Sequence, residues 1–154
     1  MKKLAMIVFS LAILTTACSM SGVKEVPTMS ATPEYSIEDA ERIARIKIPA
    51  EAYEIQVYTV TGWMDDAALI KFKLPSNKLQ SFLDEYGFQV EKGYWPFQDW
   101  SSVEWWPNRK EDGEPPISNY LGGELDFPGY YVQKIVVDIS NPDVYTVYLE
   151  CFEV

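Results

Sequence analysis

The strongest constraint on the fold is a regular alternation of apolar and polar side chains in two neighbouring segments. Residues 53–60 and 67–74 repeat with a period of two, as in the apolar series Ala68, Ile70, Phe72 and Leu74. This period is typical of antiparallel strands that bury one face and leave the other in water. Residues 61–66, which contain Gly62, predict the hairpin loop between the two strands.

A period near 3.6 predicts one clear helix after the first hairpin. Leu79, Phe82, Leu83 and Tyr86 follow at i, i+3, i+4 and i+7 and form one apolar stripe. The hydroxyl of Ser76 is a candidate N-cap, and Gly87 can end the helix in a left-handed conformation. We expect the stripe to cover the apolar face of the sheet.

A shorter helix is predicted over residues 37–46, ahead of Pro49. Ser36 is its candidate N-cap. Glu38 and Asp39 fall in the first turn, where carboxylates interact favourably with the helix dipole.

A second hairpin is predicted near the C-terminus, and it completes the fold class. Residues 130–139 and 144–152 are dense in Val, Ile and Tyr and flank residues 140–143, where Pro142 favours a turn. Residues 135–137 are apolar without alternation, which indicates central strands. The sequence predicts an α+β fold: an antiparallel four-stranded sheet of two hairpins, one or two helices on one face, and a long aromatic insert.

The insert, residues 93–129, concentrates aromatic side chains. Four of the five tryptophans lie within it, and five prolines argue against regular structure. Two interpretations stay open: the rings complete the core, or some remain exposed as a platform for a sugar, a peptide or a protein. The candidate binding residues are Trp95, Trp100, Trp105, Trp106, Asp99 and Glu104.

The N-terminus has the layout of a secretory signal peptide. Lys2 and Lys3 precede the largely apolar run 4–14, which is shorter than the roughly 20 residues of a spanning helix. Small residues then lead into Cys18. Residues 14–18, Leu-Thr-Thr-Ala-Cys, resemble the lipobox of bacterial lipoproteins, with Thr15 where that family usually has an aliphatic residue.

The resemblance implies cleavage before Cys18, a diacylglycerol on its thiol and a third acyl chain on its amine. Two or more chains make a stable membrane anchor. Residues 1–17 are then the signal peptide, 18–34 the acylated cysteine and a flexible tether, and 35–154 a single α+β domain. The implied location is the cell envelope: the periplasmic side of the outer membrane in a Gram-negative cell, since Ser19 follows the cysteine.

A second resemblance covers residues 48–152. Ile48-Pro49-Ala50, the run 70–75, Phe82-Leu83 with Gly87-Phe88, and the run 147–150 are similar to a pattern in small uncharacterised bacterial lipoproteins. That resemblance implies no activity.

Cysteine and histidine usage narrows the chemistry. With Cys18 acylated, Cys151 has no partner within the chain, so we expect a buried, inert thiol and no intramolecular disulfide. Histidine is absent, which excludes Ser–His and Cys–His nucleophile systems and histidine-ligated zinc. No cofactor or metal site is predicted, because Asp112-Gly113-Glu114 alone is not a calcium loop.

The net charge of −10 argues against nucleic acid and leaves basic partners open. The leading hypothesis is a non-catalytic binding domain, lipid-anchored at the envelope, with a basic protein or a glycan as partner. The alternative is a carboxylate-dependent hydrolase of envelope glycans. That activity requires two carboxyl groups about 5–10 Å apart beside a tryptophan-lined groove.

Overall fold

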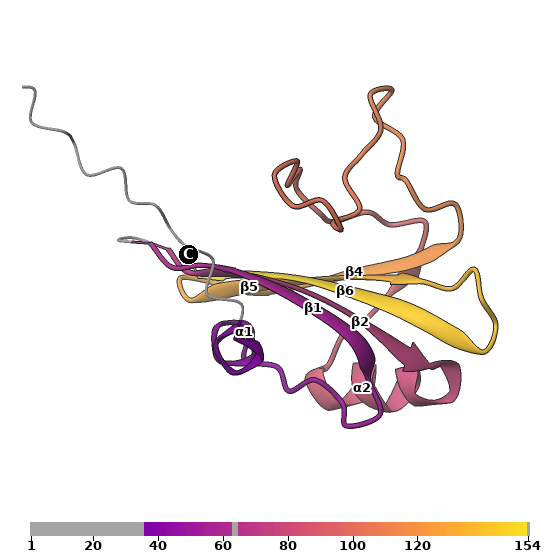
Figure 1. Ribbon diagram of the computed structural model, residues 1–154, viewed down its shortest axis with the longest axis horizontal. Coiled ribbons are helices and arrows are strands. Elements are labelled where there is room, and N and C mark those ends of the chain that lie inside the picture. Colours follow the sequence, from indigo (N-terminus) through magenta and orange to yellow (C-terminus); the bar gives the residue numbers. More distant parts are fainter. Residues whose placement is uncertain (1–35, 63–64, 154) are drawn as a thin grey trace, which may run out of the picture. The chain divides into compact units, whose positions relative to one another are not determined.

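The computed structural model describes residues 36–62 and 65–153. They belong to the second of two compact units, residues 31–154. The predicted signal peptide, Cys18 and the tether lie outside the described residues. The elements follow one another as α1 (Ile37–Ala44), β1 (Tyr53–Val60), β2 (Ala67–Pro75), the 3-10 turn η1 (Ser76–Lys78), α2 (Leu79–Tyr86), β3 (Glu91–Lys92), β4 (Tyr120–Phe127), β5 (Tyr131–Asp138) and β6 (Val144–Glu153) (Figure 1).

One antiparallel sheet organises this unit, in the order β1-β2-β6-β5-β4-β3. The α+β class, the antiparallel sheet and the two predicted hairpins, β1–β2 and β5–β6, are confirmed. The prediction of four strands is wrong, because the sheet has six. The additional strands are β3 and β4, and β4 is formed by residues that were predicted to be irregular insert.

The missed strand β4 contains two consecutive glycines, Gly122 and Gly123, within the insert that is predicted to lack regular structure. Glycine is depleted in strands because it contributes no side chain to pack. The pair therefore hides the strand signal, although β4 pairs with β5 over its whole length.

Helix α1 begins as predicted and ends two residues earlier. The Ser36 Oγ accepts a hydrogen bond from the Asp39 N–H at 3.3 Å, and Arg45 turns left-handed after Ala44. The Ala44 carbonyl accepts a hydrogen bond from Gln133 Nε2 at 2.6 Å, in a buried position. A side chain of β5 therefore replaces the next helical donor and joins the end of α1 to the sheet.

Helix α2 confirms the apolar stripe, with Leu79, Phe82 and Leu83 buried. Gly87 ends it at φ 79°, as predicted. Ser76 does not cap α2 with its side chain; it begins the 3-10 turn that leads into the helix. Neither helix of the described part is long and apolar enough to cross a lipid bilayer.

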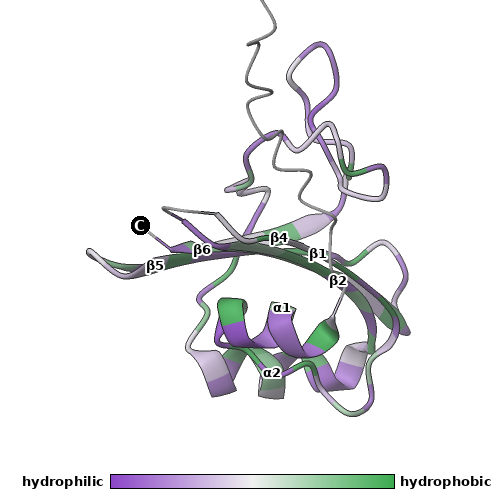
Figure 2. Cartoon of the chain, turned by 60° about the vertical axis from the view of Figure 1, so that its left-hand side comes forward, coloured by the Kyte–Doolittle hydropathy of each residue, from purple (hydrophilic) through white to green (hydrophobic). Residues whose placement is uncertain are grey.

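The sheet separates two apolar clusters. Both helices lie on one face, and the irregular segment 93–119 lies on the other (Figure 2). The larger cluster, on the helix face, includes Phe72, Ile135, Val147 and Leu149, and Cys151 is buried within it as predicted. The second cluster packs on the insert face around Trp95, Phe97, Trp106 and Tyr120.

Candidate functional site

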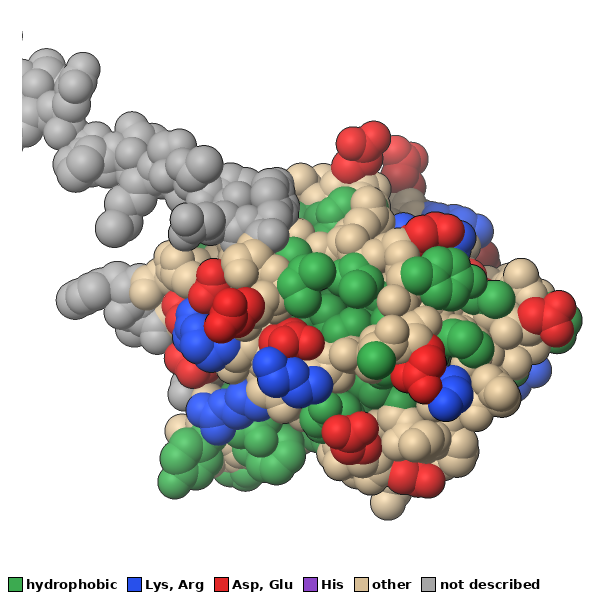
Figure 3. Space-filling view, turned by 60° about the horizontal axis from the view of Figure 1, so that its bottom comes forward, with side chains coloured by type: hydrophobic (Ala, Val, Ile, Leu, Met, Phe, Trp, Pro, Cys, Tyr) green, Lys and Arg blue, Asp and Glu red, His purple; other side chains and the backbone are tan. Residues whose placement is uncertain are grey.

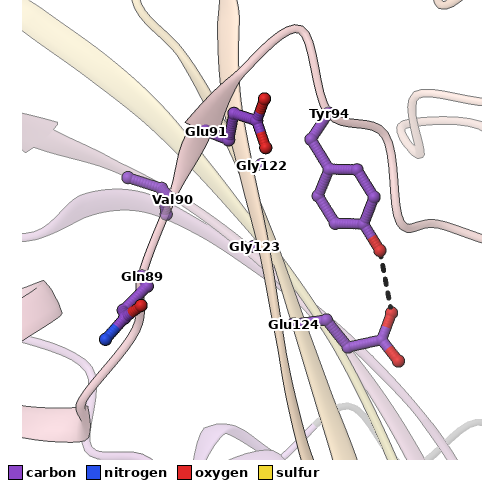
Figure 4. A pocket seen from close by; sticks show the side chains of 7 residues that line it. All are labelled: Gln89, Val90, Glu91, Tyr94, Gly122, Gly123 and Glu124. Carbon is purple, nitrogen blue, oxygen red and sulfur yellow. Dashed lines mark hydrogen bonds between the residues drawn. The ribbon is translucent and has the colours of Figure 1, made fainter.

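The chain reaches the insert face by passing around the edge of β4. A Cβ atom at Gly122 would overlap the Tyr94 carbonyl oxygen, and one at Gly123 would lie 2.5 Å from the Gln89 carbonyl oxygen. Neighbouring residues of a strand face opposite sides of the sheet. The missing side chains of the two glycines therefore leave room for residues 89–94 to pass from the helix face to the insert face at the edge of β4. This passage is called the crossing; Gln89 lies before it and Tyr94 after it (Figure 4).

The crossing borders a hollow of about 410 Å³. Figure 4 shows the Tyr94 ring on one side and the Glu124 carboxylate below it, with 3.4 Å between the phenol oxygen and Glu124 Oε2. Partial desolvation and, second, the charge of Glu124 raise the pKa of Tyr94.

Beyond the crossing, two of the predicted binding residues form the centre of the second cluster. Trp95 and Trp106 are 8% and 4% exposed. Trp95 meets the rings of Phe97 and Tyr120 edge to face at 5.5 and 5.3 Å. Such geometry contributes beyond the buried area alone. These two tryptophans therefore act as core, which matches the first of the two interpretations of the insert.

The other two tryptophans, Trp100 and Trp105, remain half-buried at the surface of the insert. Trp105 packs edge to face on Trp106 at 5.8 Å. The backbone of Trp100 is clamped by Asn108, whose Oδ1 accepts from the Trp100 N–H at 2.6 Å and whose Nδ2 donates to the Trp100 carbonyl at 3.1 Å. Both tryptophans pack against the second cluster, and these two residues together are called the tryptophan surface.

A buried carboxylate that the sequence reading missed fixes this surface to the sheet. Glu150 on β6 is 0% exposed. It accepts hydrogen bonds from the Trp100 indole N–H at 2.6 Å and from the Gln98 backbone N–H at 3.2 Å. Lys134 Nζ, on the neighbouring strand β5, lies 3.8 Å from Glu150 Oε2 and is also buried. Two hydrogen bonds and one ion pair thus compensate the burial of this charge.

One polar atom of the cluster stays without a partner. Trp106 Nε1 is buried and has no hydrogen-bond acceptor within the part of the chain that the structure describes. A buried unsatisfied donor is rare in native proteins and destabilises the site that holds it. The ring that carries this atom packs against Trp105, one of the two residues of the tryptophan surface.

The predicted acidic residues Asp99 and Glu104 are exposed next to Trp100 and Trp105 in the chain. Three more exposed acids follow in the same segment, Glu111, Asp112 and Glu114. Two basic residues of the segment, Arg109 and Lys110, are exposed as well. The solvent side of the insert is therefore predominantly acidic.

The helix face is charged in a different way. It shows basic side chains directly beside acidic ones (Figure 3). Lys47 lies 2.7 Å from Glu41 and Lys78 lies 2.7 Å from Glu51. Among the described residues no ion pair involves any of the five acids of segment 93–119.

The described residues hold no group of three or more His, Cys, Asp or Glu side chains placed to bind a metal ion. The fold and site together define an α+β domain with an aromatic, acidic insert on the open face of its sheet. No protein-family model, no curated protein and no solved structure matches this chain.

Proposed function

We propose that this chain is a lipid-anchored protein of the cell envelope whose folded domain binds a basic partner through the tryptophan surface. The observation that carries the binding role is the buried Glu150, which holds Trp100 in one orientation at the surface. A binding site whose side chains are fixed before the partner arrives loses less conformational entropy on association. Tryptophan is also the residue type most enriched at binding hot spots.

The charge of the insert supports a cationic partner. The five exposed acids of segment 93–119 have no ion-pair partner among the described residues, whereas several acids of the helix face do. Charge complementarity of this kind accelerates association and selects partners of opposite sign. A glycan is the alternative ligand, because sugar rings also pack on exposed tryptophan.

The envelope location rests on the leader sequence. The positive start, the short apolar run and the resemblance of residues 14–18 to a lipobox support acylation of Cys18. Mass spectrometry of the native chain tests this part separately. The expected N-terminal residue is an acylated Cys18, and the variant Cys18→Ser is expected to lose the lipid.

The binding role is tested by photo-crosslinking in native envelopes, with the crosslinking residue in place of the exposed Ser102 between the two tryptophans. The expected product is a basic protein, captured at low salt and lost in 0.5 M salt. Trp105→Ala and the double variant Asp99→Asn, Glu104→Gln should abolish the product. A matched double variant on α2, Asp84→Asn with Glu85→Gln, should leave it intact.

Two outcomes would contradict the proposal. If the product persists in Trp105→Ala, the partner does not bind at the tryptophan surface. If both double variants weaken the product equally, binding depends only on the total charge of the protein. Incubation of the same protein with cell-wall glycan distinguishes the hydrolase alternative from binding alone, since only a hydrolase would release soluble glycan fragments. Glu150 is a poor candidate for such catalysis, because its oxygens are already occupied by Trp100, Gln98 and Lys134.

A further inference from the structure

In the part of the chain that the structure describes, no strand covers the outer edge of β4 beyond the short strand β3. β3 pairs with only two residues of β4, Leu121 and Gly122. The Tyr120 carbonyl oxygen also faces this edge, because it accepts a hydrogen bond from the Gly93 N–H at 3.2 Å. Among residues 36–62 and 65–153, the rest of β4 has a neighbouring strand, β5, on one side only.

The alternation of an antiparallel strand identifies the free groups. The N–H and C=O of every second residue point to the same neighbouring strand. Since those of Tyr120 point outward, those of Glu124 and Asp126 do so too. Within the described part of the chain, no hydrogen bond satisfies these outward groups, and both residues are exposed.

The path of the chain between α2 and β3 leaves this edge uncovered. In the register of β3, residues 86–90 would have to run along β4 to cover residues 123–127, but Gln89 lies against the helix face at Gly123 instead. The hollow of about 410 Å³ lies at the place where β3 departs, and Glu91, Tyr94 and Glu124 line it. An added strand would therefore enter at this hollow and run toward the β4–β5 turn.

We propose that the β4 edge, residues 123–127, is a second binding site, which takes an extended peptide of alternating basic and apolar residues by strand addition. On the insert face the added strand meets the carboxylates of Glu124 and Asp126, which select Lys or Arg. On the helix face it meets Leu125 and Phe127, which select apolar side chains; Phe127 is 37% exposed. Main-chain hydrogen bonds supply affinity, and alternate side chains supply specificity.

A second copy of the chain fits this edge less well than a basic peptide does. Antiparallel pairing of two β4 edges would bring Glu124 of one copy beside Asp126 of the other on the same face. Like charges directly opposite each other in a sheet are destabilising. Acidic side chains on an open edge thus discourage self-pairing and leave the edge available to a strand of opposite charge.

The site is separate from the tryptophan surface and is tested separately. The probe is an eight-residue peptide of alternating Lys and Val, added to the full chain in detergent. Amide NMR is expected to show perturbation centred on Glu124 and Asp126, with no change at Trp105. A peptide of alternating Glu and Val should not bind.

Removing the N–H groups along one edge of the peptide measures the contribution of the main-chain hydrogen bonds without altering the protein. N-methylation of alternate Lys residues is expected to reduce affinity roughly tenfold or more, since each lost bond contributes about 0.5–1.5 kcal/mol. On the protein side, Asp126→Pro removes one outward N–H, a change that edge strands tolerate. Asp126→Asn removes only the charge and should weaken binding less than Asp126→Pro does.

Three results would overturn the proposal. The first is equal affinity for the methylated and unmodified peptides. The second is a perturbation centred on Trp100 and Trp105 rather than on β4. The third is a dimer in sedimentation experiments that Asp126→Pro dissociates, since a second copy of the chain would then occupy the edge.

Discussion

The indole N–H of Trp100 donates a hydrogen bond of 2.6 Å to a carboxylate oxygen of Glu150, 50 residues further along the chain. The bond joins the irregular insert to β6, one of the two central strands of the sheet. Because Glu150 is fully buried, its charge depends on the insert for both of its hydrogen-bond donors, and on Lys134 only for an ion pair. The insert is therefore part of the fold, although it contains little regular structure.

The first prediction concerns the removal of this carboxylate. Glu150→Ala leaves the Trp100 and Gln98 donors and the ammonium of Lys134 without their acceptor. Breaking a buried charge pair in this way is expected to reduce the free energy of unfolding by about 3–5 kcal/mol. Urea unfolding followed by tryptophan fluorescence measures the change. Glu153→Gln, an exposed carboxylate on the same strand, is the matched control and should change stability by less than about 0.5 kcal/mol.

The second prediction concerns the crossing at the edge of β4. Gly122→Ala introduces a methyl group where the Tyr94 carbonyl already lies, so the chain must move away from the strand. Overpacking of this kind is expected to cost about 1–3 kcal/mol. Faster hydrogen exchange should appear at Glu91 and Gly93, whose N–H groups face this part of β4. Ser118→Ala, at an exposed position just before β4, should leave both measurements unchanged.

The elements that were predicted correctly have signals of their own. Alternation identifies β1 and β2, and the apolar stripe with Gly87 identifies α2, because a strand or helix with one buried face repeats its pattern locally. β4 carries no such signal. Its glycines are required because the backbone of residues about thirty positions earlier lies where a side chain would be. A two-residue strand such as β3 is likewise defined only by its neighbour.

The sequence predicts which residue types form the candidate site, but it does not predict how they are arranged in space. The sequence indicates that the tryptophans matter, but it does not separate the buried Trp95 and Trp106 from the half-buried Trp100 and Trp105, since all four share one irregular segment. Glu150 was missed as a site residue. Its signal is a charged residue between Leu149 and Cys151 within a strand, which suggests a buried partner but does not name Trp100.

The third prediction concerns the thiol of Cys151. Burial and, second, the charge of Glu150 raise its pKa, so little reactive thiolate exists in the folded protein. With Ellman's reagent at pH 8, we expect the folded full chain to react on the order of a hundredfold more slowly than the urea-unfolded chain. The same titration tests the anchor. One slow thiol fits an acylated Cys18, whereas an additional fast thiol would show that Cys18 is free.

The fourth prediction concerns stability at high pH. Desolvation and, second, the charge of Asp138 raise the pKa of Tyr148 from 10.0 to about 12. Below pH 10 the phenol keeps its proton in both the folded and the unfolded chain, and its contribution to stability is complete. Between pH 10 and 12 the unfolded chain releases the proton first. The free energy of unfolding then falls with rising pH, by up to about 1.4 kcal/mol per unit for one proton.

Tyr148→Phe isolates that contribution, because it removes the titrating group and keeps the ring that packs on Trp106 at 6.0 Å. Urea unfolding of both proteins at pH 8, 9.5 and 11 should show a nearly constant difference up to pH 9.5. At pH 11 the difference should shift in favour of the variant. Burial also raises the pKa of Cys151, so its thiol ionises first in the unfolded chain, but this effect is common to both proteins and cancels in the comparison. A difference that stays constant to pH 11 would mean that Tyr148 ionises equally in both states, and the packing of the insert on β6 would then be looser than the structure has it.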